Sequence, residues 1–184
     1  MSKRFPVPDF DRDQFKNLPW AEPSTLPPEK VASLSASGKG EAIGAHPVGV
    51  SAELADHFGF RMEGKSAAMC ILPAQEVRMT GRSWAWSIQR ALVIDSLDPG
   101  RANVLADWRT PRPMNTRLGP DNGILLAARV VFLLLGHQYS DHWIANRTLI
   151  KSGADQAAKG FSIISASDDR INDFHSCNLA FSWS

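Results

Sequence analysis

One stretch of alternating residues constrains the fold of this chain more than any other feature. From residue 83 to residue 95 the sequence reads SWAWSIQRALVID. Every second position along one face of this stretch carries a large apolar side chain, with one exception at Arg90: Trp84, Trp86, Ile88, Leu92 and Ile94. A period of two residues is typical of a β-strand that buries one face. We therefore predict one long strand over residues 83–95.

Several shorter segments repeat this pattern and are separated by turn-forming residues. The segments are NVLADWRT (103–110), WIANRTLI (143–150), GFSIIS (160–165) and HSCNLAFSWS (175–184), and DPG (98–100) predicts a turn. The last segment places Cys177, Leu179, Phe181 and Trp183 on one face. We predict a mainly β fold, an antiparallel β-sandwich or barrel of jelly-roll-like type, with one or two short helices.

Two further segments bear on the helices. VSAELADHFGF (50–60) predicts a short helix, because Ser51 can cap its start and Gly59 can end it. NGILLAARVVFLLLG (122–136) is apolar on every face, so periodicity cannot separate a buried helix from a strand that is covered on both sides. The β-branched Val130 and Val131, with Phe132, favour the strand.

The first 48 residues differ in composition from the rest of the chain. Seven of the twelve prolines lie before residue 50, followed by SLSASGKGEAIG (33–44). We predict an extended Pro/Ser/Gly-rich arm over residues 1–48 and a β-rich globular domain over residues 49–184. Phe5, Phe10, Phe15 and Trp20 suggest that the arm docks, either on a neighbouring copy of the chain or on its own domain.

Composition excludes several classes of protein. The 184 residues are 43% hydrophobic and 21% charged, which is typical of a globular protein, and the net charge of +1 is not that of a strongly basic nucleic-acid binder. Cys70 and Cys177 lie in apolar segments, so we expect two buried free thiols. The longest apolar run, residues 124–135, is too short to cross a bilayer. Without a segment like a signal peptide, we expect a cytoplasmic protein, or a virion protein if the chain is viral.

The four tryptophans of the predicted strands raise the question of which surface they face. Trp84, Trp86, Trp108 and Trp183 all fall on apolar faces. We expect them to share one interior, either a packed core or the lining of a ligand cavity.

Arginines concentrate in the segment DWRTPRPMNTRLGP (107–120). Arg109, Arg112 and Arg117 follow one another there without an acidic residue between Asp107 and Asp121. Guanidinium groups bind phosphate in a bidentate manner, so the segment predicts a loop that contacts an anion such as a nucleic-acid backbone. The alternative is a charged loop that contacts only water.

Histidines and nucleophiles give little support for catalysis. His137, His142 and His175 are candidates for a metal site, but their spacing matches no common ligand motif, and a polar turn explains it equally well. No catalytic motif and no motif for a cofactor is present, so we predict neither a catalytic residue nor a cofactor.

These features together predict a non-enzymatic, self-assembling structural protein. In this interpretation it is the protomer of a coat-like or matrix-like homo-oligomer, and its Arg-rich loop contacts an anionic partner such as nucleic acid. The alternative is a small β-barrel that binds or converts an apolar small molecule.

Overall fold

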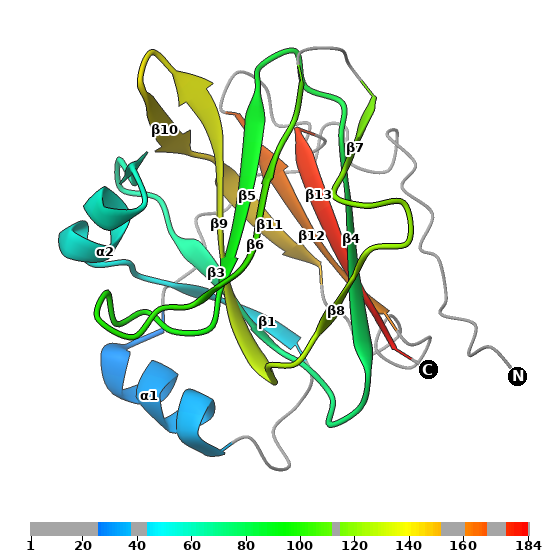
Figure 1. The fold of residues 1–184 in the computed structure, drawn as a ribbon. Helices are drawn as coiled ribbons and strands as arrows, with labels where there is room; N and C mark the ends of the chain where they lie inside the picture. Colours follow the sequence, from blue (N-terminus) through cyan, green and yellow to red (C-terminus); the bar gives the residue numbers. More distant parts are fainter. Residues whose placement is uncertain (1–25, 38–43, 112–114, 152–160, 169–175, 184) are drawn as a thin grey trace, which may run out of the picture.

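The chain forms two β-sheets that face each other, with two short helices against the outer face of one sheet (Figure 1). A computed structural model describes residues 26–37, 44–111, 115–151, 161–168 and 176–183. Strands account for 52% of these residues. The predicted mainly β fold is confirmed, in the form of a sandwich.

The first sheet, sheet A, contains seven strands: β1 (Gly44–Val48), β2 (Phe60–Arg61), β3 (Ala67–Ile71), β5 (Gln89–Ile94), β6 (Val104–Arg109), β9 (Val130–Tyr139) and β10 (His142–Ala145). β9 is its central strand, because it pairs with β5 along one edge and with β3 and β10 along the other. β6 pairs with β5, and β1 pairs with β3. These pairings are antiparallel, whereas β2 pairs with β10 in parallel.

The second sheet, sheet B, contains six strands: β4 (Val77–Ser83), β7 (Thr116–Leu118), β8 (Ile124–Leu126), β11 (Arg147–Lys151), β12 (Phe161–Ser167) and β13 (Cys177–Trp183). The order β11–β12–β13–β4 is antiparallel throughout, and β7 and β8 share the far edge of β4. The predicted C-terminal strand is confirmed: Cys177, Leu179, Phe181 and Trp183 all face the core between the sheets.

Apolar side chains cover both faces of sheet A. Its inner face meets sheet B in one core, which includes Val131, Leu133 and Leu135 of β9. Its outer face meets the helices α1 (Pro28–Ser37) and α2 (Ala52–His57) in a second core, which includes Phe132 and Leu134. None of the described helices is long and apolar enough to cross a membrane.

The two cores explain why residues 122–136 show no periodicity. The segment is neither one helix nor one strand, because β8 lies in sheet B and β9 lies in sheet A. β9 is buried on both faces, so apolar residues occupy successive positions along it. The preference for strand was correct, but the segment crosses from one sheet to the other between residues 126 and 130.

The helix predicted over residues 50–60 is confirmed as α2. The Ser51 hydroxyl accepts a hydrogen bond from the backbone N–H of Leu54 at 3.2 Å, and this bond caps the first turn. Gly59 follows the helix with a φ of +74°, a conformation that favours glycine. Leu54 and Ala55 lie on the inner side of the helix and are buried in the second core.

The single strand predicted over residues 83–95 is wrong. β4 ends at Ser83 in sheet B and β5 begins at Gln89 in sheet A, so residues 84–88 are the connection between the sheets. We name this connection the 84–88 loop. The alternating pattern continued through it because Trp84 and Trp86 are apolar, although neither belongs to a strand.

Part of the segment predicted as an arm belongs to the folded structure. Residues 28–37 form α1, and residues 44–48 form β1 within sheet A. The docking residues predicted in the arm, Phe5, Phe10, Phe15 and Trp20, lie outside the described residues. Docking of residues 1–25 stays a prediction.

Candidate functional site

Arg90 is a charged residue on the apolar outer face of sheet A. It shares this face of β5 with Leu92 and Ile94, and it is 5% exposed. Its Nε and one terminal nitrogen donate to the two carboxylate oxygens of Asp107 on β6, at 2.8 and 2.9 Å. Its other terminal nitrogen donates to the backbone carbonyl of Phe58, just after α2, at 2.6 Å. A buried guanidinium is stable when its donors are bonded in this way.

Two aromatic rings enclose the Arg90 guanidinium. Its central carbon lies 5.1 Å from the ring centroid of Phe60 on β2 and 5.6 Å from that of Trp143 on β10. Gly136 on β9 makes room for this arrangement, since a Cβ there would lie 2.8 Å from the Phe60 ring. Residues of β2, β5, β9 and β10 therefore pack closely around the guanidinium, and we call Arg90, Phe60 and Trp143 the platform.

Asp107 stands at the solvent side of this platform. Its side chain is 30% exposed. Partial burial raises the pKa of its carboxyl group, but the hydrogen bond and charge of Arg90, and then those of Arg109, outweigh the burial and hold the pKa below its ordinary value. Asp107 is therefore ionised at neutral pH and can accept further hydrogen bonds.

Arg109 is the exposed member of the cluster. Its guanidinium lies 5.5 Å from the ring centroid of Trp143 and 3.5 Å from a carboxylate oxygen of Asp107, while its side chain is 56% exposed. Among the described residues, Asp107 is the hydrogen-bonding partner of the Arg109 guanidinium, and a guanidinium has five donors. Most of its donors are therefore not used by the described residues.

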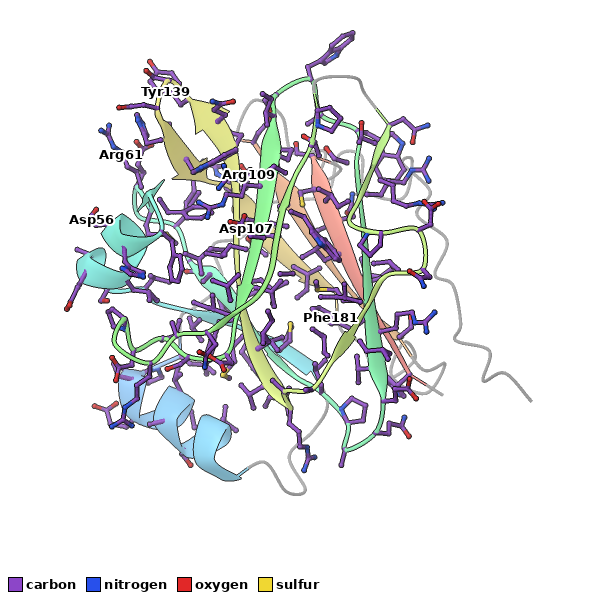
Figure 2. The ribbon with its side chains drawn as sticks, in the orientation of Figure 1. Asp56, Arg61, Asp107, Arg109, Tyr139 and Phe181 are labelled. Atoms are coloured by element: carbon purple, nitrogen blue, oxygen red, sulfur yellow. The ribbon has the colours of Figure 1, made fainter. Side chains whose placement is uncertain are left out.

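We name Arg90, Asp107, Arg109 and Trp143 the Arg–Asp cluster. Figure 2 shows Asp107 and Arg109 on the same side of the molecule as Arg61 and Tyr139, next to α2 and β10, whereas Phe181 lies between the sheets. The cluster presents a carboxylate acceptor that Arg90 holds in place beside the exposed donors of Arg109, with the Trp143 ring next to the Arg109 guanidinium. Such a surface can bind a polar molecule that both donates and accepts hydrogen bonds.

Of the three arginines predicted as one anion-binding loop, Arg109 and Arg117 lie at different places in the fold, and the joint role of the three stays a prediction. Arg109 ends β6 in sheet A, and Arg117 lies on β7 in sheet B. Arg117 donates to Asp121 at 2.6 Å in an exposed ion pair. Arg112 lies outside the described residues. Arg109 alone of the three belongs to the Arg–Asp cluster.

The four tryptophans do not share one interior. Trp183 is buried in the core between the sheets, and Trp108 packs against that core over Gly119, whose φ is +77°. Trp84 is half-buried beside Arg82, and Trp86 is 78% exposed. Their place in the 84–88 loop, rather than on a strand, explains the difference.

The predicted histidine candidates have separate partners. His137 Nδ1 lies 2.7 Å from Oδ1 of Asn146, and His142 Nδ1 lies 3.1 Å from a carboxylate oxygen of Asp141. His175 lies outside the described residues. Within the described part of the chain no three His, Cys, Asp or Glu side chains are grouped so that they could hold a metal ion.

Sequence reasoning found Arg90 only as an interruption of an apolar face, and it missed the roles of Asp107, Phe60 and Trp143. The interruption was a usable signal, because a charged residue on a buried face requires a partner. Which residue becomes that partner depends on how the strands pair, and a short sequence motif does not show the pairing. Asp107 lies 17 residues after Arg90, and Phe58 lies 32 residues before it.

Comparison with known proteins gives a likeness of fold. No family model and no curated protein matches the chain. Among solved structures, the C-terminal domain of the BC2L-C lectin from Burkholderia cenocepacia has 16% identity and a TM-score of 0.47, covering 63% of this chain and 94% of that chain. The Ralstonia solanacearum high-affinity mannose-binding lectin has 16% identity and a TM-score of 0.47, covering 63% and 95%. The Chromobacterium violaceum lectin CV2L, solved with alpha-methyl-fucoside, has 12% identity and a TM-score of 0.45, covering 63% and 95%.

These comparisons overturn the predicted function. The similar structures are lectin domains, so the prediction of a coat-like or matrix-like structural protomer with a nucleic-acid-binding loop is wrong. The alternative, a barrel for an apolar small molecule, gains no support either, because the described fold is a two-sheet sandwich whose interior is filled by side chains.

Proposed function

We propose that this chain is a non-enzymatic carbohydrate-binding protein, and that the Arg–Asp cluster contacts the sugar. The observation that carries the proposal is the bidentate pairing of buried Arg90 with Asp107, which fixes a carboxylate beside the exposed Arg109. A sugar hydroxyl donates one hydrogen bond and accepts others. Asp107 supplies the acceptor and Arg109 supplies the donors.

The rigidity of the cluster supports binding. Binding a small polar ligand costs free energy whenever side chains must become ordered. Asp107 is already ordered by Arg90, and Arg109 is already stacked on Trp143. Trp143 also offers apolar ring surface beside the polar groups, as ligand sites commonly do.

The ionisation of Asp107 supports binding rather than catalysis. Glycoside hydrolysis uses a pair of carboxyl groups, one of which is protonated with a raised pKa. Asp107 is the single carboxylate of the Arg–Asp cluster, and its pKa is lowered. The names of the three lectins agree with a sugar ligand, although their likeness to this chain extends only to the fold. Association into a homo-oligomer stays a prediction.

A glycan array followed by calorimetry tests the proposal. We expect the wild-type protein to bind a subset of neutral or acidic glycans, and Arg109→Ala to weaken the best of them by about tenfold or more, the loss expected for one charged hydrogen-bonding group. Arg101→Ala is the matched control, because Arg101 pairs with Asp98 in an exposed turn and its side chain is 85% exposed. The proposal fails if no glycan is bound, or if Arg109→Ala binds as well as wild type.

A further inference from the structure

Trp86 is the most exposed of the large hydrophobic side chains in the described part of the chain, at 78%. It lies in the 84–88 loop that leads into β5, the strand that carries Arg90. An indole left in water gives up the stabilisation that burial would provide. An exposed tryptophan suggests a binding role only if the loop that carries it is ordered. We therefore ask which interactions hold the 84–88 loop.

The 84–88 loop is held by a continuous series of side-chain hydrogen bonds. Ser87 Oγ donates to Asp168 at 2.8 Å, and Gln89 Nε2 donates to Ser87 Oγ at 2.6 Å. Asn146 Nδ2 donates to Gln89 Oε1 at 2.7 Å, and Asn146 Oδ1 lies 2.7 Å from His137 Nδ1. An amide oxygen can only accept, so His137 Nδ1 carries the proton. We name this series the His137–Asp168 chain.

The His137–Asp168 chain joins the two sheets at the end where Trp86 is exposed. His137 belongs to β9 in sheet A, and Asp168 follows β12 of sheet B. Each donor in the series points the same way, from His137 toward the carboxylate. Gln89 and Asn146 are buried, at 0% and 1% exposure, so breaking one link leaves a buried polar group unpaired. The loop therefore presents Trp86 from a fixed backbone.

The loop lies beside the Arg–Asp cluster. The Thr110 N–H donates to the Gln89 carbonyl at 2.9 Å, and the Gln138 N–H donates to the Ile88 carbonyl at 2.9 Å. Thr110 follows Arg109, and Gln138 precedes Tyr139, whose side chain is 61% exposed. Arg109, Trp86 and Tyr139 therefore stand at the same end of three neighbouring strands, which span about 10 Å at the usual spacing.

We propose that the ligand is an oligosaccharide, and that Trp86 binds a sugar unit beyond the one held by the Arg–Asp cluster. The inference rests on the proposed function and extends it. Trp86 lies in the loop before β5, whereas Arg109 ends the neighbouring strand β6, so we place the indole at a sugar unit next to the one that the cluster holds. The flat apolar face of an indole suits the C–H face of a sugar ring. Because the loop is ordered before binding, the second contact adds affinity at low entropic cost.

Calorimetry with sugars of increasing length tests this inference. The probes are the methyl glycoside of the sugar with the strongest array signal and its linear oligomers of up to six units. We expect wild-type affinity to rise by about tenfold or more from the methyl glycoside to the longer oligomers. Trp86→Ala should abolish this rise and leave the affinity for the methyl glycoside unchanged. Leu125→Ala is the control, since Leu125 is 54% exposed on β8 of sheet B.

A second variant tests the role of the loop as a positioning element. Ser87→Ala removes one link of the His137–Asp168 chain without touching the indole, so we expect it to reduce the gain with length while preserving the binding of the methyl glycoside. Provided that the methyl glycoside binds, two results would overturn the inference. Either the affinity of the wild-type protein does not rise with the number of sugar units, or the Trp86→Ala variant shows the same rise as the wild type. Absence of binding to every glycan would overturn the proposed function as well, and this result is distinguishable from the others.

Discussion

Arg90 shows how one residue can determine a site. A guanidinium on an apolar face would be unstable alone, and the fold gives each of the three guanidinium nitrogens of Arg90 one acceptor, from Asp107 or Phe58. The same bonds fix the carboxylate that we propose as the sugar acceptor. In this proposal, stability and sugar binding depend on the same ion pair.

Asp107→Asn tests this dependence. The substitution leaves the buried Arg90 charge without its counter-ion, so we expect the free energy of unfolding at neutral pH to fall by about 3 kcal/mol. Asp121→Asn is the matched control, because Asp121 and Arg117 form an exposed pair that contributes about 0.5 kcal/mol or less. Urea denaturation measures both, and equal effects of the two substitutions would contradict the structural role of Arg90.

The same pair predicts a dependence on pH. The pKa of Asp107 is lower in the folded state than in the unfolded state, so its contribution to stability is present above the unfolded pKa. This contribution is lost as the pH falls through the folded pKa. The difference between wild type and Asp107→Asn should therefore narrow below about pH 4. Denaturation curves at several pH values measure this, and a constant difference would argue against the ion pair.

At the scale of elements, the His137–Asp168 chain connects strands of both sheets. Asn146→Ala removes its central link and leaves Gln89 and His137 without their partners. We expect a loss of about 2 kcal/mol in the free energy of unfolding, together with faster hydrogen exchange in the 84–88 loop. Asn103→Ala is the control, because the hydrogen bonds of Asn103 with Asp95 are exposed. Unchanged exchange in the loop would show that the series does not hold it.

The elements also show how far the sequence alone could lead. The strands β6, β12 and β13 and the helix α2 were predictable, because their apolar residues or a capping residue give a local signal in the sequence. β9 was ambiguous because two cores cover it, and the 84–88 loop was mistaken for strand because its tryptophans continue the alternation. The alternation of apolar residues along a segment indicates that one face is buried. It does not indicate which sheet the strand joins.

The Arg–Asp cluster was out of reach for the same reason. Arg90 could be recognised as an exception, but Phe60 and Trp143 meet it only after β2, β5, β9 and β10 have paired. Gly136 contributes by having no side chain, and no motif marks such a position. The role predicted for Arg109, Arg112 and Arg117 as one loop stays a prediction, because Arg112 lies outside the described residues.

At the scale of the whole molecule, the two-sheet core makes a prediction about its thiols. Cys70 and Cys177 are both buried free cysteines in the core between the sheets. Burial raises the pKa of the Cys177 thiol to about 12 and that of Cys70 further still. Because the thiolate is the reactive form, we expect neither cysteine to react with a thiol reagent in the native protein at pH 8, and both to react in denaturant. Rapid labelling of either one in the native state would contradict the packing of the sandwich.

The claim that the Arg–Asp cluster binds sugar is tested most directly by following the tryptophan indole N–H signals by NMR during titration with an array-selected glycan. Trp143 lies in the cluster, whereas Trp108 and Trp183 belong to the core between the sheets and serve as internal controls. We predict that the Trp143 signal shifts in a saturable way while the signals of Trp108 and Trp183 stay in place. A Trp143 signal that does not move while the glycan is bound would contradict the account.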